Sequence, residues 1–202
     1  MIERIREILN KEAIAIRNIP ITTNFGDAIG IIHRQVHGKN GKLVTSGMGK
    51  AGQIAHNIAT TFSSTGTPAA FLHPSEAQHG DLGILQENDV LLAISNSGKT
   101  REIIELIDLK NNLYPLIPVI VITANENSPL AQKADCFIST GAPGEVCPLG
   151  LTPTTSTTVM TVIGDVLVVL LMEKIGFNAN DYSKRHHGGY LGMKSREISG
   201  KE

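Results

Sequence analysis

The segment from Ser95 to Thr100 carries the clearest chemical signal in the sequence. It follows a short apolar run, precedes a helix-length segment, and contains three hydroxyl side chains and one glycine. Ser95, Ser97 and Thr100 can each donate a hydrogen bond to a phosphate oxygen, and the N–H groups at a helix start add a favourable dipole. An ordinary helix cap would use one hydroxyl rather than three. The spacing therefore predicts a phosphate-binding loop.

The ending Gly98-Lys99-Thr100 also fits the nucleotide-binding Walker A pattern. The leading glycine of that pattern would fall on Ala93, which lies inside the predicted strand. A relaxed pattern accepts alanine, yet the later apolar run 119–122 ends in Thr123 with no acidic residue to hold Mg²⁺. An NTPase is therefore a weaker interpretation than a phosphate loop without a metal.

A second loop, from Ser46 to Gly52, follows a predicted strand, opens a predicted helix and satisfies G-x-G-x-x-G. This is the dinucleotide fingerprint, and Glu76 after the next strand could be the ribose-binding acid. Lys50 lies inside the glycine run, where its amine would reach a substrate oxygen or phosphate, and only one such unit is evident. A dinucleotide site is thus weakly supported, and a plain glycine turn with a solvated lysine stays open.

A third group of candidates joins the loop 141–153 with the end of the chain. Glu145 lies in a segment of Gly, Pro and Cys with no helical face to decorate, and such a position more often carries function than packing. His186 and His187 precede two glycines, where the backbone can approach a ligand closely. Either histidine can titrate near neutral pH, although solvated surface histidines are the alternative.

The composition narrows the classes of partner. The chain has 202 residues, 41% of them apolar, which suits one well-buried domain. Its formal charge of -1 and its 4% of aromatic residues without Trp do not favour nucleic acid or an anionic membrane. Neither Cys136 nor Cys147 is spaced for zinc, and His79 and Asp81 supply at most two ligands, so we expect no metal. Lone cysteines and no basic-then-apolar leader fit a reducing cytoplasm.

The elements that must position these loops follow from the apolar periodicity. Apolar residues every three or four positions predict two N-terminal helices within residues 1–37. Strands and helices then alternate, which predicts an α/β fold with a parallel sheet covered on both faces. The predicted strands are 43–45, 69–72, 90–94, 119–122 and 136–138, and the helices between them are 51–62, 101–109 and 130–134. In such sheets a ligand binds beyond the carboxyl ends of the strands, where these loops begin.

The last third of the chain is predicted to hold one long helix and a tail. The helix starts near Thr154, in a Ser- and Thr-rich turn that offers several N-cap candidates, and ends before Gly176. Its most apolar part, Val159–Met172, is too short for a membrane span and indicates a buried helix. Residues 178–202 have weak periodicity, so we expect an irregular tail or a subunit arm.

Several short motifs carry a resemblance to a known family: Gly47–Gly52, Ser64–Pro68, His73–Ala77, His79–Gly83, Ala93–Gly98, Glu145–Leu151, Pro153–Thr154 and Ser156–Thr158. In this order they resemble the sugar isomerase (SIS) domain of D-arabinose 5-phosphate isomerases, over nearly the whole chain. The resemblance implies a three-layer, flavodoxin-like sandwich around a mostly parallel five-stranded sheet. It also implies interconversion of D-ribulose 5-phosphate and D-arabinose 5-phosphate through an enediolate, without a cofactor. That reaction is the first step toward Kdo (3-deoxy-D-manno-octulosonate) for lipopolysaccharide or capsule.

The family's functional positions fall on residues of this chain. The catalytic ones would be Lys50, Glu102, Glu145 and His186, and those that bind the substrate or its phosphate would be Ser46, Gly47, His79, Ser95, Asn96, Ser97, Thr100 and His187. Family members commonly have Glu where this chain has Lys99 and Pro where it has His187. Many also carry two cystathionine-β-synthase-type domains after the SIS domain. This chain ends before them, so we expect any regulation to act on the catalytic domain itself.

Such an isomerase needs a base, a charge partner for the enediolate and an acid. We expect Glu145 to be the base, provided that burial raises its pKa, and Lys50 to stabilise the enediolate. His186 would move protons between the substrate oxygens, and its place in the tail could let it reach a neighbouring subunit. Glu102 could equally be a structural acid in the first turn of a helix.

Other interpretations of the same residues stay open. The domain could be a non-catalytic sensor of a sugar phosphate or nucleotide sugar, or it could isomerise another phosphosugar. A product of the Kdo pathway could also inhibit from the same cleft. The resemblance and the apolar helix suggest a homotetramer with sites at subunit interfaces.

Overall fold

A parallel five-stranded sheet forms the centre of the computed structural model, which describes residues 1–200. The strands are β1 (Leu43–Gly47), β2 (Ala69–Phe71), β3 (Val90–Ile94), β4 (Val119–Thr123) and β5 (Cys136–Ser139). They follow the order β2-β1-β3-β4-β5, and all four neighbouring pairs are parallel. This is the flavodoxin-like order, which places a ligand site at the carboxyl ends of β1 and β3. The predicted fold class is confirmed.

The complete burial of the central strands explains why they can be predicted from the sequence. Every residue of β1, β3 and β4 is buried, because helices cover both faces of the sheet. Their sequences are therefore continuous runs of apolar and small residues rather than alternating ones. Each observed strand agrees with its predicted range within two residues.

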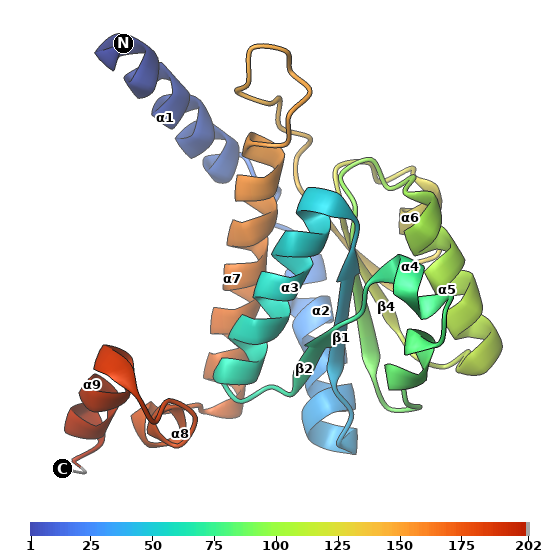
Figure 1. The fold of residues 1–202 in the computed structure, drawn as a ribbon, viewed down its shortest axis with the longest axis vertical. Coiled ribbons are helices and arrows are strands. Elements are labelled where there is room, and N and C mark those ends of the chain that lie inside the picture. Colours follow the sequence, from blue (N-terminus) through green and yellow to red (C-terminus); the bar gives the residue numbers. More distant parts are fainter. Residues whose placement is uncertain (201–202) are drawn as a thin grey trace.

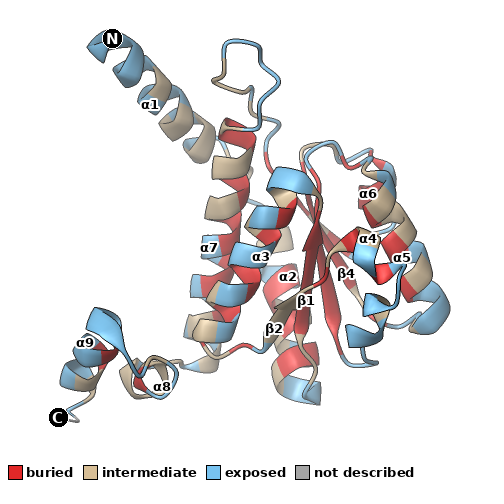
Figure 2. Ribbon diagram, in the orientation of Figure 1, coloured by how far each residue is buried: buried red, intermediate tan, exposed pale blue. Residues whose placement is uncertain are grey.

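Two separate hydrophobic clusters hold the helices against the sheet. On one face lie α2 (Asn24–Ile32), α3 (Gly49–Ser64) and α7 (Thr155–Ile175), and the short π-helical turn His33–Gly38 extends α2. On the other face lie α4 (Pro74–Ala77), the 3₁₀ turn Asp81–Ile84, α5 (Arg101–Leu113) and α6 (Pro129–Gln132). Figures 1 and 2 show these layers, with buried residues concentrated on the sheet and on the helix sides that face it.

The helix α7 is longer and more uniformly apolar than a surface helix requires. Its length and composition alone would allow it to cross a membrane, but half of its most apolar stretch is buried inside the domain. Val166, Val169 and Leu170 remain exposed on its outer side. A helix that is apolar all round is normally covered all round, so this outer side is a candidate contact surface.

Two parts of the chain project from this body (Figure 1). One is α1 (Ile2–Arg17), which buries no residue fully and touches α7. The other is the C-terminal unit, made of α8 (Ala179–Ser183) and α9 (Gly189–Ser199), beyond the end of α7. The sequence predicted an irregular tail or a subunit arm here, and the structure shows two helices. The side chain of Asn178 caps the start of α8. The helices were not predicted because few apolar residues mark them. The last two residues of the predicted tail, 201–202, lie outside the described residues.

Candidate active site

A cavity of about 470 Å³ opens at the carboxyl edge of the sheet, between the start of α3, the loop after β3 and the start of α7. This volume suits a small ligand. Its walls are formed by Met48, Lys50, Ala51, Ser95, Asn96, Ser97, Thr100, Pro143, Gly144, Glu145, Gly150, Leu151, Pro153, Ser156, Thr157 and Met160. Three of the predicted site groups therefore meet: the hydroxyl loop, the lysine of the glycine loop, and Glu145. Lys50 and Glu145 are the charged side chains of this wall.

The hydroxyl loop closes on itself and leaves the start of α5 uncapped. Ser95 Oγ lies 2.7 Å from Thr100 Oγ1 and accepts the Gly98 N–H at 3.1 Å. Gly98 has φ of 63°, and a Cβ there would lie 2.0 Å from Ser128 Oγ, so the turn requires glycine. Thr100 stands at the N-cap of α5 but makes no side-chain cap hydrogen bond. The simple capping interpretation is therefore not supported, and the first N–H groups of α5 suit an anion.

The glycine loop positions Lys50 through close packing of α3 on β1. A Cβ on Gly52 would lie 2.5 Å from the carbonyl oxygen of Gly47, and one on Gly47 would lie 2.8 Å from the backbone of Ala51. These glycines thus serve the approach of helix to strand. Lys50 is exposed in the first turn of α3, and its side chain forms no hydrogen bond or ion pair within residues 1–200. An unpaired ammonium in a cleft suits an anionic or oxyanionic ligand.

Glu145 lies in the loop between β5 and α7, which rises above α7 in Figure 1, and its side chain is hydrogen-bonded to the N-terminal end of α7. Its Oε2 accepts the Thr154 N–H at 2.7 Å, the Thr154 hydroxyl at 2.8 Å and the Ser156 N–H at 3.3 Å. Burial raises the pKa of Glu145, but the hydrogen bonds from Ser156 and Thr154 outweigh burial and hold this pKa below its usual value. The sequence-based condition of a raised pKa is therefore not met in this arrangement. Glu145 is a carboxylate at neutral pH.

Sequence reasoning did not single out the donors that hold Glu145. The Ser- and Thr-rich start of α7 was interpreted only as a set of cap candidates. In the structure Thr154 and Ser156 donate to Glu145, and Ser156 and Thr157 line the cavity. The available signal was the density of hydroxyl residues directly after the loop that carries a lone acidic residue.

Six predicted site residues do not line this cavity, and four of them belong to the sheet and the elements that cover it. Ser46 is fully buried, and its hydroxyl donates to the carbonyl oxygen of Leu72 at 2.7 Å, so it joins β1 to the segment after β2. Gly47 packs against α3. Glu102 lies in the first turn of α5, and His79 is exposed after α4. The roles predicted for Glu102 and His79 stay predictions.

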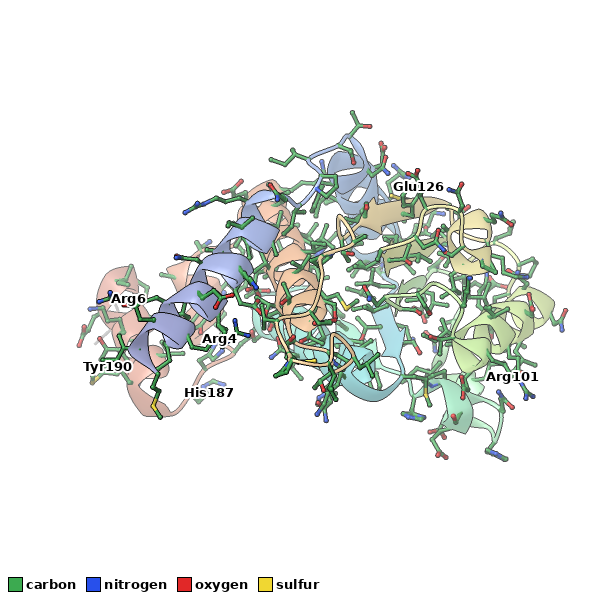
Figure 3. The ribbon with its side chains drawn as sticks, turned by 90° about the horizontal axis from the view of Figure 1, so that it is seen from above. Arg4, Arg6, Arg101, Glu126, His187 and Tyr190 are labelled. Carbon is green, nitrogen blue, oxygen red and sulfur yellow. The ribbon has the colours of Figure 1, made fainter. Side chains whose placement is uncertain are left out.

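The two tail histidines lie far from the cavity of their own chain. They follow α8, at the opposite end of α7 from Glu145, and a helix of 21 residues is about 30 Å long. Seen from above, His187 and Tyr190 lie at the opposite end of the molecule from Arg101, which follows the hydroxyl loop (Figure 3). The ring of His186 stacks on Tyr182, with ring centroids 3.7 Å apart. One chain alone therefore does not bring His186 to Lys50 and Glu145.

The residues that could ligate a metal do not gather. Within the described part of the chain, no three His, Cys, Asp or Glu side chains come together as a possible metal site. Cys147 instead accepts the N–H groups of Leu151 and Thr152 at 3.2 and 3.1 Å, which shapes the loop before α7. The arrangement at the cleft is thus one cation, one carboxylate and a hydroxyl-rich helix start.

Comparison with known proteins identifies the family of this fold and cleft. The SIS domain model matches residues 37–170, and the chain belongs to the SIS domain family. The resemblance drawn from the sequence motifs is thereby confirmed.

Curated relatives of this chain carry the name arabinose 5-phosphate isomerase KdsD. A relative from Escherichia coli K12, named arabinose 5-phosphate isomerase KdsD, is 49% identical over 76% of this chain and 46% of its own length. The protein of that name from Yersinia pestis is 44% identical over 92% of this chain and 55% of its own length. The chain spans about half the length of these curated relatives.

Two solved structures match almost from end to end. A Bacteroides fragilis protein, provisionally described as a phosphosugar isomerase involved in capsule formation, is 67% identical, with a TM-score of 0.93, over 94% of this chain and 99% of its own. An Escherichia coli CFT073 protein, solved in complex with arabinose 5-phosphate, is 34% identical, with a TM-score of 0.85, over 92% of this chain and 96% of its own.

Proposed function

We propose that the protein is an aldose–ketose isomerase that interconverts D-ribulose 5-phosphate and D-arabinose 5-phosphate. The observation that carries the proposal is one cavity lined by an ionised Glu145, by the hydroxyl loop before the uncapped start of α5, and by Lys50, whose side chain has no partner among the described residues. The names of the relatives and the arabinose 5-phosphate complex of a structural neighbour support it. The product would feed Kdo synthesis in the cytoplasm for lipopolysaccharide or capsule.

The phosphate would bind at the loop from Ser95 to Thr100, in hydrogen-bond range of the first N–H groups of α5. This end of the ligand is the same in both sugars and contributes binding rather than chemistry. The carbonyl end would then extend toward Lys50 and Glu145 on the other walls of the cavity.

The reaction would move one proton between two carbons and one between two oxygens. Glu145 would take the proton from C1 of the ketose, the C2 oxygen would become the enediolate oxygen, and Lys50 would stabilise its charge. A proton would pass from the C1 hydroxyl to the C2 oxygen, and Glu145 would return its proton to C2, which leaves the aldehyde at C1. No electrons leave the substrate, so no cofactor is required.

His186 would carry the proton between the two oxygens from a second copy of the chain. The distance between the C-terminal unit and the cavity of the same chain supports this assignment. The exposed apolar side of α7 supports a homotetramer, since an uncovered surface of this kind favours association. Glu102 would act from the start of α5, and a product of the Kdo pathway would compete for the same cleft.

The direct test is incubation of the purified protein with D-ribulose 5-phosphate, followed by NMR of the sugar products. The expected result is D-arabinose 5-phosphate, with exchange of one carbon-bound proton with solvent. A six-carbon ketose phosphate in a parallel sample tests for another phosphosugar substrate. Binding of arabinose 5-phosphate without turnover would contradict the proposal and favour a sensor.

A further inference from the structure

The segment 141–155, which carries Glu145, contacts the chain directly after α1 at its start and α1 itself at its end. At its start, Gly141 packs so closely on the chain after α1 that a Cβ there would lie 3.0 Å from the carbonyl oxygen of Asn18 and 3.1 Å from Pro20 Cδ. At its end, Glu12 Oε1 accepts the hydroxyl of Thr155 at 2.7 Å. These two contacts join the loop to a helix that lies outside the sheet and its covering layers (Figure 1).

Between these two contacts the loop is held by hydrogen bonds among its own residues and their direct neighbours in sequence. The hydrogen bonds found for residues 141–153 in the described structure stay within residues 139–156. Its conformation, and with it the place of Glu145, therefore depends strongly on where the first turn of α7 lies. This first turn of α7 is also the part of the site that contacts α1, through Thr155 and Glu12.

Two carboxylates share three consecutive residues of this turn. Thr154 and Ser156 donate to Glu145, and Thr155, which lies between them and is 1% exposed, donates to Glu12. The positive end of the helix dipole favours both carboxylates. Glu12 Oε2 is buried and accepts no hydrogen bond from the described residues. A buried oxygen of this kind lowers stability, so stability alone does not explain an acid at this position.

We propose that Glu12 is a positioning residue of this site, which fixes the first turn of α7 through Thr155 and thereby holds the donors that orient Glu145. Glu12 does not line the cavity, so it acts through other residues and not on the substrate. The expected effect on kcat rests on the proposed function, whereas the expected effect on the position of Glu145 does not.

The kinetic test compares three variants with a matched control. Glu12→Ala and Thr155→Val each remove the contact, and we expect kcat to fall about 10- to 100-fold, because small displacements of a catalytic group have effects of this size. KM should change less than about threefold, since the phosphate loop belongs to α5 and not to α7. Glu12→Gln keeps an oxygen acceptor and should restore most of kcat. Glu7→Gln, which loses only exposed ion pairs on α1, should match the wild type.

The double variant separates positioning from general destabilisation. Glu12→Ala with Thr155→Val should lose no more kcat than either change alone, because both remove one contact. Thermal unfolding of every variant shows whether it is folded at the assay temperature. Additive losses of kcat, or an unchanged kcat in folded Glu12→Ala, would overturn the proposal.

A second readout needs no turnover. The carboxyl carbon of Glu145 is followed by NMR over pH in protein with labelled glutamate, and Glu145→Gln assigns the signal. Lys50 is the charged side chain that lines the cavity with Glu145, and Glu12 faces the same turn from α1. Thr155→Val keeps both charged groups and removes only the hydroxyl that joins Glu12 to the turn. In this variant the pKa of Glu145 should rise toward its usual value as its donors loosen. An unchanged pKa of Glu145 in this variant would refute the role of Glu12. An inactive wild-type protein would refute only the proposed function, and the two failures can therefore be told apart.

Discussion

The cleft and the C-terminal unit each carry part of the predicted catalytic set, but they are built in different ways. The cleft is formed by loops whose flanking strands and helices belong to two buried clusters. The C-terminal unit packs on the end of α7 around an apolar hollow of about 280 Å³. It exposes Tyr190, Leu191 and Ile198, which are 56 to 69% accessible.

This difference predicts which steps a single chain can carry out and which would need a second copy. The chain by itself places Lys50 and Glu145 in one cavity, because β1, β3 and α7 fix their positions. It holds His186 at the other end of α7, stacked on Tyr182, in a unit that also exposes apolar side chains. Binding should therefore be a property of the single chain, whereas full turnover should require assembly.

The largest expected effects come from the charged pair of the cleft. Glu145→Gln should lower kcat by about a hundred- to ten-thousand-fold, since it removes the proposed base without changing its shape. Lys50→Met should lower kcat by about a hundred- to a thousand-fold, since it removes the charge proposed to stabilise the enediolate. Steady-state kinetics with ribulose 5-phosphate measures both, and calorimetric titration with arabinose 5-phosphate checks that the variants still bind. Turnover within threefold of the wild type would break the assignment of chemistry to the cleft.

The next effect tests whether the C-terminal unit acts on a neighbouring chain. His186→Ala should lose about a hundredfold in kcat. Co-expression of this variant with Glu145→Gln, under separate tags, should recover up to about a quarter of wild-type turnover in mixed oligomers, because one chain supplies the cleft and the other the histidine. Two inactive variants that remain inactive when mixed, although purified together, would show that His186 does not act between chains.

A smaller effect is expected at the turn of the phosphate loop. Gly98→Ala forces a left-handed conformation that costs about 1–2 kcal/mol, and its Cβ would displace the Ser128 side chain. We expect arabinose 5-phosphate to bind about tenfold more weakly, roughly the loss of one charge-assisted hydrogen bond. Gly176→Ala is the matched control, because φ is 65° there and nothing lies within 4 Å of the added Cβ at this end of α7. It should share the loss of stability and keep the affinity, and equal affinities in the two variants would contradict the phosphate role of the loop.

The parts of the cleft that lie directly after strands were predictable from the sequence. Continuous apolar runs locate β1, β3 and β4, and the rule for parallel sheets then places Lys50 and the hydroxyl loop at one edge. The position of Glu145 was not predictable, because it depends on the N-terminal end of a helix and on donors that look like cap residues. Ser46 shows the opposite case: a hydroxyl beside a glycine loop that serves the packing of β1.

The C-terminal unit was predictable to a smaller extent. Its helices are marked by the Asn178 cap rather than by an apolar stripe, since it has little core of its own to bury. The separation between His186 and the cleft follows from the straight run of α7, a property of the packed domain that no local motif contains.

The smallest expected effect is a pH dependence of stability that belongs to the cleft. Hydrogen bonds from the start of α7 lower the pKa of Glu145 in the folded chain. A lowered pKa contributes stability that is present above the pKa of the unfolded state and is lost as pH falls through the folded value. Glu145→Gln lacks this contribution, so its Tm should lie below that of the wild type at pH 7, and the difference should shrink as the pH falls below the usual pKa of a glutamate. Ser97→Ala is a neutral change in the same cleft, and the difference between its Tm and that of the wild type should stay constant with pH in calorimetric scans. A difference that also stays constant for Glu145→Gln would mean that the start of α7 does not hold the carboxylate in solution.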